Sequence, residues 1–241
     1  MEKLSYFFLI ILLYSCSGDK WNDCIQPHGE ENLEVRNHGA FQALKVDGNF
    51  SVKLVQDSTY AVEILAGENF INQIITKVEN GVLILEEDIT CKFVREQNRV
   101  YTVTVHCANL ERIAHFSGKI LEGELESEKL EVDKWAGGGD ILLELTCDSL
   151  FGRIHAGSGD LVFSGNSKFA YIYQRGYGFI KNQALHLSYA YIDKGGTGDC
   201  ILTVSEKAEI DFNSFGDLIL HGQGEYEVIE KSGSGEIIVR P

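Results

Sequence analysis

A glycine-centred motif returns about every twenty residues through the second half of the chain. It reads FSGKI, GGGDI, GSGDL, GYGFI, GTGDC, SFGDL and GSGEI, with key glycines Gly118, Gly139, Gly159, Gly178, Gly198, Gly216 and Gly235. The steps between successive key glycines differ from one another by three positions at most. This period is too short for a propeller blade or a helical repeat, and it matches one turn, or rung, of a parallel β-solenoid.

Apolar residues recur at fixed places relative to these glycines. Two positions after them lie Ile120, Ile141, Leu161, Ile180, Cys200, Leu218 and Ile237. Five to seven positions before them lie Ile113, Val132, Ile154, Ile172, Ile192, Ile210 and Val228. Since every second side chain of a strand points to the same face, each set predicts one column of side chains inside the solenoid. The predicted fold is all-β, a right-handed parallel β-helix over residues 113–241.

The region from 33 to 112 is rich in strand patterns but lacks the glycine motif. An uncapped solenoid exposes an edge that other strands can pair with, so we interpret this region as a β-rich N-terminal cap. Within it, ENFINQII (68–75) has apolar residues three and four apart, which predicts one short helix.

The N-terminus carries targeting signals. An apolar run at 5–14 is typical of a signal peptide, and Leu13 to Cys16 (LYSC) resembles a bacterial lipobox. We therefore predict a signal peptide at 1–15, lipidation of Cys16 and a polar tether at 16–32. The membrane is then a partner through the lipid anchor, and the location is the cell envelope, as an outer-membrane lipoprotein. The face of that membrane stays open, and an ordinary secreted protein is the alternative.

Charge and cysteine content exclude several partners. The formal net charge is -15 and no cluster of Lys or Arg is visible, which argues against nucleic acid. Cys107 and Cys147 continue apolar alternations, so we expect them to be buried. No Cys or His spacing is typical of zinc, and we expect no metal and no cofactor.

Two further phrases carry a family resemblance. The chain is similar to the bacterial GIN head domain of autotransporter adhesins from about residue 40 to 240. The similarity lies in the segments FQALKVDGNFSVKLVQDS and GENFINQIITKVENGVLIL and in the GSGD-like turns. The resemblance implies a right-handed parallel β-helix, often on secreted or lipid-anchored proteins, and no established catalytic residues. The chain departs from the pattern at FSGKI and GYGFI, where Lys119 and Phe179 replace the acid of the family, and at SFGDL.

Acidic residues follow five of the seven key glycines, namely Asp140, Asp160, Asp199, Asp217 and Glu236. Alternation predicts that they form an outer column. We expect the aspartates to close their own turns through backbone hydrogen bonds. A column of bound divalent cations is the alternative.

Four tyrosines form the candidate binding site, together with Arg175. Tyr171 and Tyr173 precede Tyr189 and Tyr191 by nearly one period of the repeat, which predicts neighbouring positions on adjacent rungs. They either share an outer patch or fill the core, and the alternation with the apolar Ile172 and Ile192 favours the outside. Exposed tyrosines with polar neighbours are suited to binding sugars.

The nearly equal rung lengths leave no long loops to build a catalytic cleft, and the seven histidines are scattered. The predicted function is therefore non-enzymatic binding or adhesion to a glycan or a protein by a lipid-anchored envelope protein. A glycan-active β-helix enzyme, either a lyase or a hydrolase, and a purely structural envelope scaffold are the alternatives. The oligomeric state stays open.

Overall fold

The computed structural model describes residues 29–88 and 101–240. The predicted signal peptide, Cys16 and nearly all of the tether lie outside these residues. In the described part the chain is almost entirely β, with one helix, α3 (Glu68–Ile71), in the first half of the predicted helical segment. No helix among the described residues is both long and apolar enough to cross a bilayer.

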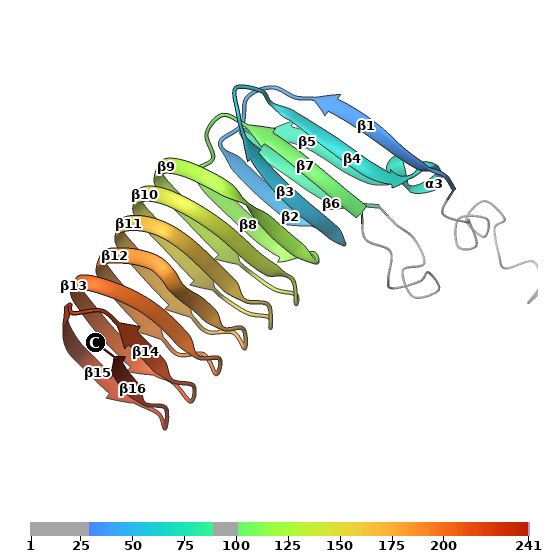
Figure 1. The fold of residues 1–241 in the computed structure, drawn as a ribbon. Coiled ribbons are helices and arrows are strands. Elements are labelled where there is room, and N and C mark those ends of the chain that lie inside the picture. The colour runs from blue at the N-terminus through green and yellow to red at the C-terminus, as the bar shows by residue number, and fades with distance from the viewer. Residues whose placement is uncertain (1–28, 89–100, 241) are drawn as a thin grey trace, which may run out of the picture.

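The second half of the chain winds into stacked parallel rungs (Figure 1). Five long strands each cover most of a rung: β9 (Ile120–Lys134), β10 (Asp140–Ile154), β11 (Leu161–Gln174), β12 (Ile180–Lys194) and β13 (Cys200–Asn213). The last strands are shorter: β14 (Leu218–His221), β15 (Glu225–Ser232) and β16 (Ile237–Arg240). The ladder from β10 to β11 pairs Ile141 with Leu161 and continues in register to Ile154 and Gln174. The predicted parallel β-solenoid is confirmed.

The first predicted column is correct from the second rung onward. Its members are neighbours in register and line the core: Ile141, Leu161, Ile180, Cys200, Leu218 and Ile237. The assignment of Ile120 is wrong, because Leu121 pairs with Ile141 while Ile120 pairs with Asp140. The step from Gly118 to Gly139 is the longest of the series, and the extra residue lies in the turn at Gly118, whose φ of 146° favours glycine.

The second predicted column has two errors. Val228 pairs with Ile210 in register, but its side chain is 43% exposed and does not lie in the core. Gly152, and not Ile154, lies between Val132 and Ile172 in the ladder. A side chain at Gly152 would meet the ring of Phe163 at 3.1 Å, so this aromatic ring fills the space that an aliphatic residue occupies in other rungs.

Ile154 belongs to a different interior column, which is mostly polar. It lies between Lys134 and Gln174 in register, and Gln174 pairs in turn with Lys194. Both lysines are buried, and burial lowers the pKa of each ammonium group.

These interior polar groups satisfy the carbonyls of the glycine turns. Lys134 Nζ donates to Gly139 O at 2.6 Å, and Lys194 Nζ donates to Gly198 O at 2.7 Å. Gln174 Nε2 donates to Gly178 O at 2.7 Å. Because a buried carbonyl without a donor is costly, this column holds the turns in place from inside.

The key glycines also stack on one another. A Cβ atom at Gly139, Gly159, Gly178 or Gly198 would lie closer than 3.0 Å to the carbonyl oxygen of the key glycine one rung earlier. Only a residue without a side chain permits this approach, which explains why the motif repeats.

The region 33–112, predicted to be a cap, holds both parallel and antiparallel strands. The parallel strands are β2 (Ala43–Asp47), β3 (Phe50–Gln56), β6 (Val82–Glu87) and β7 (Tyr101–Cys107), and they continue into β8 (Arg112–Ser117), nearly all of which belongs to the predicted rungs. The antiparallel strands, β1 (Glu31–Asn37), β4 (Ala61–Gly67) and β5 (Ile74–Glu79), close the end of the solenoid (Figure 1). β2 lies between β6 and β8, and β3 lies between β7 and β9, so the first two layers are not stacked in chain order.

Candidate functional site

The second halves of β11 and β12 present the four predicted tyrosines on the outer face of the solenoid. Their inward neighbours Ala170, Ile172, Ala190 and Ile192 are buried, whereas all four tyrosines are partly or largely exposed. Strand alternation therefore directs the phenol rings outward, as the sequence favoured.

The pairing of these tyrosines differs from the prediction. In the ladder between β11 and β12, Tyr171 pairs with Tyr191 and not with Tyr189. Tyr189 lies opposite Phe169, and Tyr173 lies opposite Asp193. The steps between glycines vary from rung to rung, and the sequence alone does not show where in a rung the difference is absorbed.

Aromatic side chains from three rungs surround a shallow hollow of about 390 Å³. It is lined by Phe151, Phe169, Tyr171, Tyr189, Ala190, Tyr191, Lys207 and Glu209. Phe151, Phe169, Lys207 and Glu209 were missed by the sequence reasoning. The periodicity did contain a signal for the two phenylalanines, because Phe151 stands one period before Tyr171 and Phe169 one period before Tyr189, and each pairs with that tyrosine in the ladder.

Tyr189 offers the most accessible ring of the hollow. Its exposed fraction is 48%, and a hydrogen bond to Glu206 raises the pKa of its hydroxyl and holds the side chain. Tyr171 and Tyr191 instead stack on each other with ring centroids 5.8 Å apart. Since stacking covers one face of each of these two rings, Tyr189 is the best placed to receive a ligand from solvent.

Tyr173 and Arg175 lie beside the hollow and not in its lining. The Arg175 guanidinium sits over the Tyr173 ring at 4.6 Å and forms an ion pair with Asp193 at 2.6 Å. On the other side, the ring of His155 lies 5.4 Å from that of Tyr173 and stacks on Trp135 at 3.9 Å. The structure thus divides the five predicted site residues into a hollow and an adjoining stacked cluster.

Ion pairs border this outer face on both sides. Lys207 contacts Glu209 at 2.8 Å and Glu227 at 2.9 Å, and the hydrogen bonds to these carboxylates raise the pKa of Lys207. A second group of ion pairs surrounds Asp133. Burial raises the pKa of its carboxyl group, but hydrogen bonds from Arg153 and His155 outweigh burial and hold the pKa of Asp133 below its usual value. The charges around the hollow are therefore already paired within the protein.

Comparison with known proteins identifies a family with this sequence pattern. The family described as "Putative auto-transporter adhesin, head GIN domain" matches residues 40–224. The chain belongs to this family. The resemblance noted in the sequence is confirmed, and a search among curated proteins gives no match.

Solved structures share the fold of this GIN head domain. A putative adhesin from Bacteroides fragilis NCTC 9343 superposes with a TM-score of 0.78 at 21% identity, over 90% of this chain and 100% of that one. A putative adhesin from Parabacteroides merdae ATCC 43184 gives 0.63 at 19% identity, over 88% and 97%. A protein from Parabacteroides distasonis ATCC 8503, described as a putative lipid binding protein, gives 0.61 at 18% identity, over 88% and 94%. At these identities the likeness shows a common fold.

The acidic column of the GIN head domain is confirmed as a hydrogen-bonding element, with one correction. The aspartates do not close their own turns but accept from the backbone of the next rung. Asp140 Oδ1 accepts from the Asp160 N–H at 2.8 Å, and Asp160 Oδ1 accepts from the Phe179 N–H at 2.8 Å. The same contact joins Asp217 to the Glu236 N–H at 2.9 Å. In the described part of the chain, no group of three His, Cys, Asp or Glu side chains is arranged to hold a metal ion.

The cysteines of the described rungs are core residues. Cys107 and Cys147 are buried, as predicted, and Cys200 is buried as well; none of the three forms a disulfide. Burial raises the pKa of the Cys107 thiol to about 11 and that of Cys200 to about 12. Thiols in this state are poor nucleophiles and poor metal ligands.

Proposed function

We propose that this GIN head domain is held at the bacterial cell envelope by a lipid on Cys16 and that its aromatic hollow binds glycans without transforming them. Membership of an adhesin-head family supports a role in surface binding. The lipobox-like LYSC sequence supports the anchor, since several acyl chains give stable membrane attachment.

The observation that carries the glycan assignment is the ring of Tyr189 at the hollow. Phenol rings combine an apolar face, which packs against the C–H groups of a sugar, with a hydroxyl that hydrogen-bonds. Five aromatic side chains from three rungs converge here, and the volume of about 390 Å³ lies within the range of small-ligand pockets.

The charges at the hollow favour binding over catalysis. Glycoside hydrolysis ordinarily needs two carboxyl groups on opposite sides of the scissile bond. Glu209 is the one carboxylate in the lining, and Lys207 holds it at 2.8 Å.

A glycan array probed with the mature protein and two variants tests the glycan assignment. Tyr189→Ala removes the accessible ring and should lower the apparent affinity for the bound glycan about fivefold to tenfold. Tyr177→Ala is the matched control, because Tyr177 is 70% exposed but lies outside the hollow. A blank array with the unaltered protein, or an equal loss in both variants, would contradict glycan binding at this site.

The lipid anchor is tested separately. Membranes from cells grown with a palmitate analogue should contain labelled protein, and the variant Cys16→Ser should carry no label. Absence of label on the unaltered protein would remove the anchor without affecting the assignment of the hollow.

A further inference from the structure

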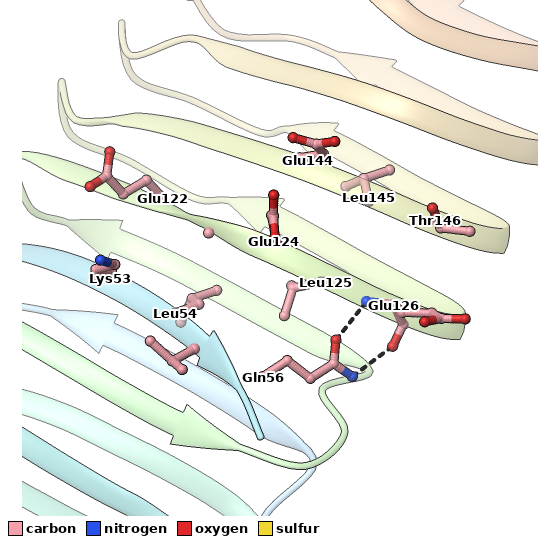
Figure 2. Close-up of a pocket in the computed structure, with 12 residues that line it drawn as sticks. Lys53, Leu54, Gln56, Glu122, Glu124, Leu125, Glu126, Glu144, Leu145 and Thr146 are labelled. Atoms are coloured by element: carbon pink, nitrogen blue, oxygen red, sulfur yellow. Dashed lines mark hydrogen bonds between the residues drawn. The ribbon is translucent and has the colours of Figure 1, made fainter. Parts of the chain in front are cut away.

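A second hollow lies on a different face, where the sheet opens between β3 and β9 (Figure 2). These two strands pair only from Ser51 to Leu54 on β3, opposite residues 120–123 of β9. The last pair is Leu54 with Gly123, where a Cβ atom on the glycine would lie under 3.0 Å from Leu54, and beyond it the two strands no longer pair. The resulting groove has a volume of about 790 Å³ and is lined by residues of β3, β9 and β10.

At the far end of this groove, the side chain of Gln56 forms the hydrogen bonds with β9 that a neighbouring strand would form. Gln56 Nε2 donates to Glu126 O at 2.8 Å, and Gln56 Oε1 accepts from the Glu126 N–H at 2.6 Å (Figure 2). A neighbouring strand forms the same two kinds of hydrogen bond with one residue in a parallel ladder. The edge of β9 therefore accepts a peptide-like group where β3 has turned away.

The groove has an apolar floor. Leu54, Leu125 and Leu145 line it and are 3%, 4% and 1% exposed. A ligand that fills the groove would cover these side chains, which favours apolar groups on its inner side.

The rim of the groove is strongly acidic. Glu122, Glu124, Glu126 and Glu144 face a single basic side chain, Lys53. Glu124 and Glu144 are direct neighbours in the ladder, an arrangement of like charges that is unfavourable. Among the described residues, no ion pair or side-chain hydrogen bond engages these two carboxylates, unlike those around the aromatic hollow.

We propose that this groove binds an extended basic segment of a partner protein, which adds as a strand beside β9. Lys53 of β3 already lies opposite Glu122, so the added strand begins beyond this pair and displaces the Gln56 amide. Glu124 and Glu126 occupy alternate positions of this part of β9, so a strand with Lys or Arg at alternate positions places a cation opposite each of them. The residues between the cations then face the leucine floor. A bound metal ion fits less well, because the described acidic residues do not converge as a metal site. The groove is separate from the aromatic hollow, so this inference does not depend on glycan binding.

Fluorescence anisotropy with a labelled hexapeptide of alternating lysine and valine tests the proposal on the mature protein. The triple variant E122Q/E124Q/E144Q should bind the peptide about tenfold more weakly than the unaltered protein. A hexapeptide of alternating glutamate and valine should not bind, and added salt should weaken binding of the basic peptide.

The matched control E30Q/E225Q/E230Q removes the same charge from exposed positions far from the groove and should bind as the unaltered protein does. Equal weakening in both triple variants would overturn the proposal, since the attraction would then follow net charge alone. Equal binding of a basic peptide N-methylated at alternate residues would overturn strand addition, because those residues have lost their N–H donors. Binding of a glucosamine oligomer in place of the peptide would overturn the choice of ligand. An unchanged glycan array in E122Q/E124Q/E144Q separates the two sites.

Discussion

Acidification should weaken the fold through one buried histidine, His115 on β8. Its side chain is fully buried, and neither ring nitrogen has a hydrogen-bond partner among the described residues. Burial, and secondly the positive charge of the neighbouring Lys134, lower the pKa of His115 from 6.5 to about 4. The imidazole is therefore neutral in the folded protein at pH values where the unfolded chain already binds a proton.

The direction and size of the effect follow from this difference in proton binding. Above pH 6.5 the imidazole is mainly neutral in both the folded and the unfolded state, so it does not change the free energy of unfolding. Between pH 6.5 and pH 4 only the unfolded chain takes up the proton, so the free energy of unfolding falls as pH falls. A pKa lowered from 6.5 to about 4 corresponds to a decrease of about 3 kcal/mol in the free energy of unfolding at the acidic end of this range.

Urea unfolding at several pH values between 4 and 7 measures this loss directly. The difference in unfolding free energy between the unaltered protein and His115→Leu should change by about 3 kcal/mol across the range, because the variant lacks the titrating group. His186→Leu, at an exposed position of β12, is the control and should follow the unaltered protein. Parallel curves for the unaltered protein and His115→Leu would refute the reasoning.

Three further predictions concern the turns. Gly178→Ala places a Cβ against the carbonyl of Gly159 and should lower the free energy of unfolding by about 1–3 kcal/mol in the same urea assay. Gly138→Ala is the control, because the nearest contact of its Cβ is a serine side chain at 3.5 Å. This variant should lower the free energy of unfolding by less than about 1 kcal/mol. Asp160→Ala leaves the Phe179 N–H without its acceptor and should cost about 1 kcal/mol. Calcium should leave the melting temperature of the unaltered protein unchanged; a rise that Asp160→Ala abolishes would restore the cation alternative.

The sequence predicts the solenoid because its causes are local. Glycines without room for a Cβ recur at rung spacing, and alternating apolar residues such as Ile141 and Leu143 must share a face of their strand. The outward direction of Tyr171 and Tyr191 follows from the same alternation. None of these conclusions needs knowledge of which residues meet across rungs.

The buried polar column is beyond such reasoning. Lys134 and Lys194 read as solvated residues near turns, since lysine is seldom fully buried. In the structure their ammonium groups donate to turn carbonyls inside the solenoid. The turn carbonyls become buried, and so need hydrogen-bond donors from inside the solenoid, only when successive turns stack on one another.

The chain by itself therefore determines the type of fold, the inward columns and the outward tyrosines, because strand period and steric exclusion act between near neighbours. The tertiary structure decides the register, which joins Tyr171 to Tyr191 and Leu121 to Ile141, because small differences in turn length are absorbed only when rungs stack. It also decides the groove, where Gln56 and Glu126, far apart in the chain, meet after β3 has inserted beside β9. Contacts between segments so distant depend on the order in which layers pack, and no local pattern encodes that order.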